Sequence, residues 1–255
     1  METSKASGTV VLRVGLALQC ATAAVFAWRY PSPINSMLFL QWGVDEEVAF
    51  LIDRALVGLL GLLTLGVLVL ARAPTFVATA FIFAAWAVAE SLGHSDLAGR
   101  LSVFAQAVRF LAPLGLWLLL MRTVPSKLWG ERLLRFAIAL TFAVHGSEAL
   151  MQHPVFLDLV LGAGRWFERV GGATLTEEGA GDILTVIGVV DLLLAGLVLV
   201  VRSRAIALWM AFWGLATAAS RWVERGDDGV LVALLRSMNV ATPLALFFIW
   251  SRRDD

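Results

Sequence analysis

The sequence predicts an all-α polytopic membrane protein with eight transmembrane helices, arranged as two parallel four-helix repeats. The chain has 255 residues, of which 59% are hydrophobic, and this composition is far from that of a soluble domain. Apolar segments of about 20 residues, the length that crosses a hydrocarbon core as a helix, recur along it. They lie at 10–28, 50–70, 74–92, 103–121, 133–151, 183–201, 204–222 and 232–250.

The second half of the chain repeats landmarks of the first. At an offset of 130 positions the matching pairs are Glu47 and Glu177, Gly58 and Gly188, Gly66 and Gly196, Arg72 and Arg202, and Pro113 and Pro243. At an offset of 122, Arg13 in the first helix falls on Arg135. Because each repeat has an even number of spans, both enter the membrane from the same side. The breakers Pro125 and Gly130 separate a first repeat at 1–125 from a second at 126–255.

Charged and aromatic residues predict the orientation of the chain. The N-terminus, the even-numbered loops and the C-terminus, which includes Arg252 and Arg253, carry an excess of basic residues, and the opposite side is net negative. The positive-inside rule makes the basic side cytoplasmic, so both termini are expected inside. Seven tryptophans near helix ends are expected to be interfacial anchors: Trp28, Trp42, Trp166 and Trp222 outside, and Trp129, Trp209 and Trp250 inside. No basic tail suggests nucleic-acid binding.

Within each repeat, the second and fourth helices have distinctive residues. The second helix has small residues along one face, namely Gly58, Gly61 and Gly66 in the first repeat and Gly188, Asp191 and Gly196 in the second. We expect this face to pack closely against neighbouring helices. The fourth helix contains Pro113 or Pro243, which predicts a kink and frees the carbonyl groups of Arg109 and Asn239. The long outer loops, roughly 29–49 and 152–182, contain apolar stretches expected to lie in the outer interface.

His145 and Glu148 form the most prominent polar pair inside a predicted span. They are three residues apart, hence on one helical face, at depths of about 10 and 6 Å below the outer helix end. The matching positions in the first repeat are Ala23 and Phe26, so the repeat does not require the pair for folding. Buried ionisable groups in membranes often mark function. The alternative is a pair that only hydrogen-bonds a neighbouring helix and fixes packing.

Further polar residues are predicted near this pair. Asp191 replaces Gly61 of the first repeat and lies about 13 Å into its helix, close to the midplane. It should point into the bundle as a functional acid or, alternatively, as a protonated interhelical hydrogen-bond donor. Arg236 and Asn239 share one face of the last helix, and we expect a Glu148–Arg236 ion pair. In the first repeat, Glu90 and Arg109 are expected to pair similarly.

The sequence contains no strong metal or nucleotide motif. Three histidines and one cysteine show no recognisable ligand spacing, and a single His-x-x-Glu is weak. A di-iron bundle would need paired Glu-x-x-His motifs. A P-loop, a dinucleotide fingerprint and a haem-attachment motif are also absent from the sequence. We therefore predict no metal site.

The fifth predicted helix carries a resemblance to a family. Arg135 at the inner end, an aliphatic stretch, and then His145, Gly146 and Leu150 near the outer end resemble the first helix of DoxX-like membrane proteins. That family has His-Gly-x-x-Lys-Leu at this place, and Ala149 stands here where the lysine is usual. The resemblance implies a four-helix unit, present here in tandem, in a bacterial inner membrane. It also implies association with quinone-linked or oxidative-stress enzymes.

These observations lead to one leading functional hypothesis and two alternatives. The leading hypothesis is a membrane subunit, without independent catalytic activity, that serves a soluble oxidoreductase partner, with a quinone as the candidate cofactor. Its site would be formed by His145, Glu148, Arg236 and Asn239. Asp191 would bind a proton or cation closer to the midplane. The first alternative is a small-solute transporter with Asp191 as the coupling site, for which discontinuous helices are diagnostic. The second is a purely structural membrane subunit.

Overall fold

The computed structural model describes residues 2–70, 72–95, 97–121 and 123–250, so Arg252 and Arg253 lie outside the described residues. All regular structure in these ranges is helical. The first half contains α1 (Glu2–Arg29), α2 (Pro33–Ser36), the π-helix η1 (Met37–Gln41), α3 (Glu46–Val69), α4 (Ala73–Leu92), α5 (Leu97–Ala105) and α6 (Ala107–Leu120). The second half contains α7 (Val124–Leu150), α8 (Pro154–Arg169), α9 (Glu177–Val200), α10 (Arg204–Arg225), α11 (Asp227–Leu234) and α12 (Ser237–Trp250).

All eight predicted segments are helical, and six or seven of the described helices are long and apolar enough to cross a membrane. The six are Ser7–Arg29 of α1, α3, α4, Gly99–Leu120 across α5 and α6, α7 and α9. The seventh is formed by α11 and α12 together, which are bent by 42°. The eighth predicted span, α10, is 22 residues long but is not in this set. It carries Arg204, Arg221 and Arg225, which lower its hydropathy.

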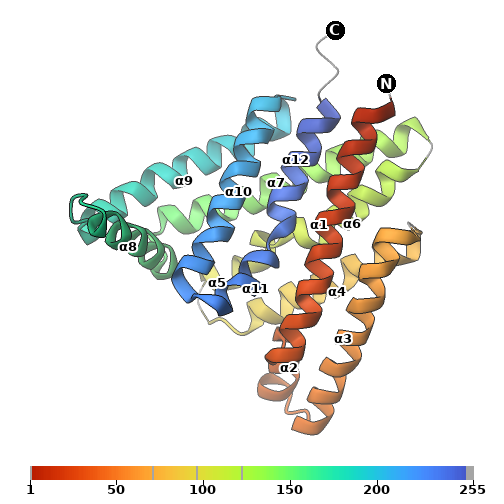
Figure 1. Cartoon of the computed structure of the whole chain (residues 1–255). Coiled ribbons are helices and arrows are strands. Elements are labelled where there is room, and N and C mark those ends of the chain that lie inside the picture. Colours follow the sequence, from red (N-terminus) through yellow and green to blue (C-terminus); the bar gives the residue numbers. More distant parts are fainter. Residues whose placement is uncertain (1, 71, 96, 122, 251–255) are drawn as a thin grey trace.

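The two halves pack against each other through their first and last helices. α1 packs on α3 of its own half and on α12 of the other half, and α7 packs on α9 and on α6. The beginning of α1 and the end of α12 lie at one end of the molecule (Figure 1). The largest core cluster lies at this junction and includes Leu12, Leu16, Leu116, Leu134 and Leu246, all fully buried.

An arginine near the start of each half caps a neighbouring helix. Arg13 of α1 donates to the last carbonyls of α3, and Arg135 of α7 donates to the last carbonyls of α9. The acceptors are Val67 and Leu68 for Arg13, both at 3.0 Å, and Val198, at 2.7 Å, and Leu199 for Arg135. The final carbonyls of a helix lack intrahelical donors and attract positive charge, so these contacts fix the relative position of the helices.

Both mid-span prolines lie inside continuous helices, and their freed carbonyls are used in different ways. Gln19 of α1 donates to the Arg109 carbonyl, at 3.3 Å. On the other side, Gly214 of α10 lies against the Asn239 carbonyl, 2.6 Å from where a Cβ at Gly214 would stand. The interruptions of these two spans lie before the prolines, at Gln106 between α5 and α6 and at Leu235–Arg236 between α11 and α12.

The small-residue face of the second helix packs closely only in part. Gly58 and Gly61 in α3 are exposed, with no atom near the place of an added Cβ, and Gly196 in α9 is likewise open. The prediction of close packing is therefore wrong for these three glycines. In contrast, Gly188 of α9 lies against Gly146 of α7. The difference arises because α9 crosses α7 at a pair of glycines, whereas Ala24 stands in α1 at the position matching Gly146.

The first outer loop is anchored by a buried carboxylate that the sequence did not single out. Asp53 of α3 is 1% exposed. It accepts hydrogen bonds from the backbone nitrogen and the hydroxyl of Ser32, at 2.9 and 2.5 Å. The Ser32 hydroxyl in turn accepts from the nitrogen of Asn35, at 3.1 Å, and so caps α2.

Replacing Asp53 by alanine should release this loop. Release of the loop lets water reach the Ser32 donors, so we expect a net loss of about 1 kcal/mol, the usual net contribution of a hydrogen bond. We expect faster limited proteolysis within 30–45 and a lower Tm. The exposed Glu46→Ala on the same helix is the control and should match the wild type. Equal cleavage rates for the two variants would contradict the anchoring role.

Tyr30 links the first outer loop to the start of α11. Its hydroxyl donates to Asp228, at 2.5 Å. This hydrogen bond and the adjacent negative charge raise the pKa of Tyr30 above its ordinary value of 10.0. Because Tyr30 is the only tyrosine in the chain, an ultraviolet absorbance titration reports on it alone. We expect a midpoint above 10 in the wild type, and a lower one in Asp228→Ala; identical midpoints would exclude the contact in solution.

Candidate functional site

A cavity of about 660 Å³ lies between α7, α8, α9, α10 and α12. α9 and α10 diverge from their short connection, and α8 lies across the wide end of the resulting wedge (Figure 1). The volume is typical of sites for small molecules, which are commonly 300–1,000 Å³. Most of the wall is apolar and includes Phe142, Phe156, Phe167, Leu159, Ile183 and Ile187. The cavity is therefore suited to a molecule with an apolar body.

Four residues singled out in the sequence line this cavity together. His145 comes from α7, Asp191 from α9, Asn239 from α12, and Arg236 from the break that precedes α12. The sequence placed these residues on three separate helices, and packing of α7, α9 and α12 brings them to one space.

A smaller chamber of about 130 Å³ shares part of this wall. His145, Arg236 and Asn239 border both spaces. Glu90 of α4, Arg109 of α6 and Glu148 of α7 border only the smaller chamber. Every predicted site residue therefore lines one space or the other, and the smaller chamber contains groups from both halves of the chain.

The charged residues around the chamber do not form the ion pairs that we predicted. Glu148 contacts His145, with 3.0 Å between its carboxylate and Nδ1 of the ring, and among the described residues it forms no ion pair with Arg236. Glu90 and Arg109 are bridged by Gln106, whose amide nitrogen donates to Glu90 at 3.0 Å and whose oxygen accepts from Arg109 at 2.6 Å. Both predicted direct ion pairs are therefore wrong. Glu148 contacts His145, three residues earlier on the same helix, and Glu90 contacts the neutral amide of Gln106.

Asp191 points into the bundle, as its place in the sequence suggested. It is 5% exposed, and Trp213 of α10 lines the same cavity. A Cβ added at Gly146 would stand 3.1 Å from the Asp191 Cβ. The close crossing of α7 and α9 therefore positions this acid beside the helix that carries His145.

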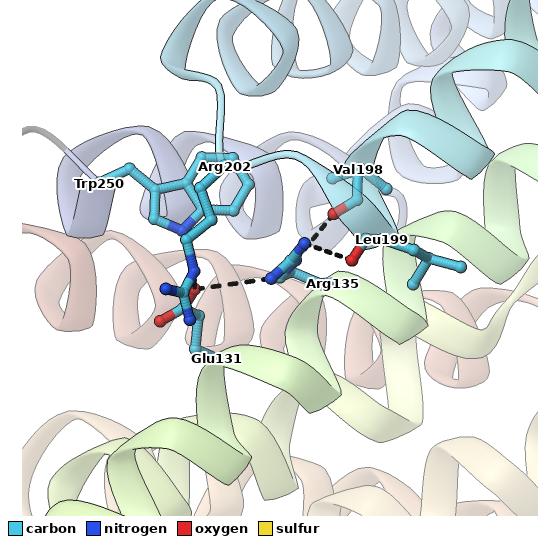
Figure 2. A network of polar contacts seen from close by, with 6 residues as sticks. All are labelled: Glu131, Arg135, Val198, Leu199, Arg202 and Trp250. Atoms are coloured by element: carbon cyan, nitrogen blue, oxygen red, sulfur yellow. Dashed lines mark hydrogen bonds and ion pairs between the residues drawn. The ribbon is translucent and has the colours of Figure 1, made fainter. Parts of the chain in front are cut away.

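A buried network at the other end of the second half was missed by the sequence analysis. Glu131 is 4% exposed. Figure 2 shows its carboxylate among Arg135, Arg202 and Trp250, with nitrogen–oxygen distances of 4.0, 2.6 and 3.0 Å. The spacing of Glu131 and Arg135, four residues apart on one helical face, was the available signal.

Trp250 belongs to this network and is 2% exposed, so its expected role as an interfacial anchor is wrong. A buried carboxylate needs hydrogen-bond donors, and the indole N–H of Trp250 provides one. The side chains of Trp28, Trp42, Trp129, Trp209 and Trp222 are exposed, and that of Trp166 lies outside the described residues.

Within the described part of the chain, no group of three His, Cys, Asp or Glu side chains is placed to hold a metal ion. Comparisons with protein-family models, curated proteins and solved structures found no match to this chain. Fold and site together define an all-helical protein with six or seven helices able to cross a membrane and an apolar cavity that carries a small set of polar groups.

Proposed function

We propose that this chain is a membrane subunit that binds a quinone, or a molecule of similar apolar body and polar head, in the 660 Å³ cavity. A soluble oxidoreductase would be its partner. The single observation that carries the proposal is the apolar cavity bordered by His145, Arg236 and Asn239. The resemblance of the fifth predicted helix to DoxX-like proteins supports the redox setting.

The donors available in the cavity suit a quinone head. A quinone offers carbonyl oxygens as hydrogen-bond acceptors, and such a site needs only one or two well-placed donors. Nδ1 of His145 is engaged by Glu148, which leaves the other ring nitrogen for a ligand. The amide of Asn239 and the guanidinium of Arg236 supply further donors.

We also propose the finer architecture: eight spans in two parallel four-helix repeats, with both termini on the cytoplasmic side of a bacterial inner membrane. In this arrangement α10 would be the eighth span. Support comes from the matched contacts of the two halves, in which Arg13 and Arg135 cap equivalent helices. The interruptions at Gln106 and Arg236 also differ by the offset of 130 positions found in the sequence.

The proposal is tested by purifying the protein in mild detergent and identifying bound molecules by mass spectrometry. We expect a quinone at near-stoichiometric amount. Thr217 lines the cavity, so Thr217→Trp should fill it and remove the quinone. Ala219→Trp adds the same side chain at an exposed position of α10 and should retain the quinone. Wild-type protein that carries only phospholipid would overturn the quinone proposal.

A second candidate function is transport of a small solute. It is favoured by the interruption between α11 and α12, bent by 42°, because discontinuous helices commonly form transporter sites. Asp191 would then be the coupling-ion site. Proteoliposomes on a solid-supported electrode should show charge movement that Asp191→Asn abolishes and Asp182→Asn, at an exposed position of α9, preserves. Equal currents in both variants would contradict this candidate.

A further inference from the structure

The smaller chamber, of about 130 Å³, lies where the two halves of the chain meet and is lined by an excess of basic groups. Three guanidinium groups, those of Arg109, Arg221 and Arg236, border it against the two carboxylates of Glu90 and Glu148. His145 and His153 also contribute to the wall. The chamber is therefore a candidate site for a negatively charged group.

The two carboxylates are already engaged by other side chains. Glu148 contacts His145 at 3.0 Å. Glu90 accepts a hydrogen bond from Gln106 at 3.0 Å, and Gln106 connects it to Arg109. Arg109 is thus linked to an acid through one amide, and neither carboxylate forms an ion pair with Arg236 among the described residues.

Among the described residues, Arg236 has one donor atom in this chamber without a protein acceptor. Its Nε is buried and has no hydrogen-bond partner in the described structure, and the buried Ser102 hydroxyl and the Asn239 amide oxygen, in the wall of the same chamber, also have none. A buried N–H donor without an acceptor is costly. The guanidinium fork of N–H donors matches the oxygens of a carboxylate or phosphate.

We infer that this chamber binds an oxyanion, a carboxylate or phosphate-type group, with Arg236 as its principal protein contact. The oxyanion is either a free small anion or the head of an anionic lipid. In the second case the tail would enter the larger cavity, because Arg236 borders both spaces. The inference does not rest on quinone binding, although Arg236 also borders the proposed quinone cavity, so that a lipid tail there would exclude a quinone. The competing occupant is water, of which the chamber would hold roughly four molecules.

The test uses full-length protein in a neutral detergent, with Tm followed as a ligand is added at constant ionic strength. One arm titrates inorganic phosphate against chloride, and the other titrates phosphatidic acid against phosphatidylcholine. A ligand that binds the folded state raises Tm in a saturable manner. We expect such a rise in wild-type protein, and an affinity about 10- to 100-fold weaker in Arg236→Gln. Arg132→Gln, which removes an exposed arginine of α7, should bind as the wild type does.

The two arms identify the source of the oxyanion. A response to both ligands indicates that a free anion suffices, and a response to phosphatidic acid alone indicates a lipid head; either supports the inference. If Arg236→Gln does not fold, Ser102→Asp decides, because it places a carboxylate in the chamber. That variant should have a higher Tm without ligand and no further response to phosphate or phosphatidic acid. No saturable response in wild-type protein, or an unchanged response in the variants, would overturn the inference in favour of water.

Discussion

Replacing Glu131 by alanine should lower the free energy of unfolding by about 3 kcal/mol, the largest effect that we expect from a single side chain. Loss of one partner from a buried ion pair commonly costs about 3–5 kcal/mol, and the lower end applies because Arg202 is 36% exposed. The variant would leave buried Arg135 without a counter-charge and the indole N–H of Trp250 without an acceptor. Tm in detergent should fall by roughly 6–12 °C.

The matched control for this prediction is Lys127→Ala, a charge deletion at an exposed position four residues earlier in α7. It should change Tm by little, because exposed charges contribute little. Glu131→Gln should be intermediate, since an amide oxygen still accepts from Trp250 but no longer balances the arginines. A Glu131→Ala protein as stable as the control would show that the network in Figure 2 does not join α7, α9 and α12 in solution.

The helices were predictable because the membrane imposes length and hydropathy on them. All eight apolar segments are helical, since a segment of about 20 apolar residues has few alternatives. The positions at which two of these helices are interrupted were harder to predict. Pro113 and Pro243 suggested kinks at their own positions, yet the breaks lie at Gln106 and Arg236. Polar residues that face the chamber interrupt the helices there, and a single sequence does not show which residues will face one another.

The candidate site was predictable as a set of residues but not as a set of contacts. Comparison of the two halves singled out His145, Glu148 and Asp191 because only the second half has polar groups there. In the structure, His145 and Asp191 both line the larger cavity. The predicted ion-pair partners of Glu90 and Glu148 were wrong because each carboxylate contacts a nearer group, Gln106 or His145. Nothing in the sequence marks Gln106 as such a partner before packing places it beside Glu90. Asp53 and Glu131 were missed because both lie near helix ends, where solvated charge is the usual expectation.

Replacing Gly188 by alanine should have the second-largest effect, because it alters the helix crossing that positions Asp191. An added Cβ would stand 2.7 Å from the Gly146 carbonyl oxygen and 2.7 Å from the Leu150 side chain. The backbone contact cannot be relieved by a rotamer change, so α9 must move away from α7. Overpacking of this kind commonly costs 1–3 kcal/mol. The displacement of Asp191 relative to His145 should also weaken ligand retention after purification.

The repeat supplies the control for this substitution. Gly58 is the matching glycine of the first half, is exposed, and has no atom within 4 Å of an added Cβ. Gly58→Ala should therefore leave Tm unchanged or raise it, since alanine favours a helix over glycine by about 1 kcal/mol. If Gly188→Ala lowers Tm while Gly58→Ala raises it, the loss at Gly188 is caused by the helix crossing and not by helix propensity. If Gly188→Ala is as stable as Gly58→Ala and keeps its ligand, α7 and α9 do not cross at these glycines, and the placement of Asp191 beside His145 is wrong.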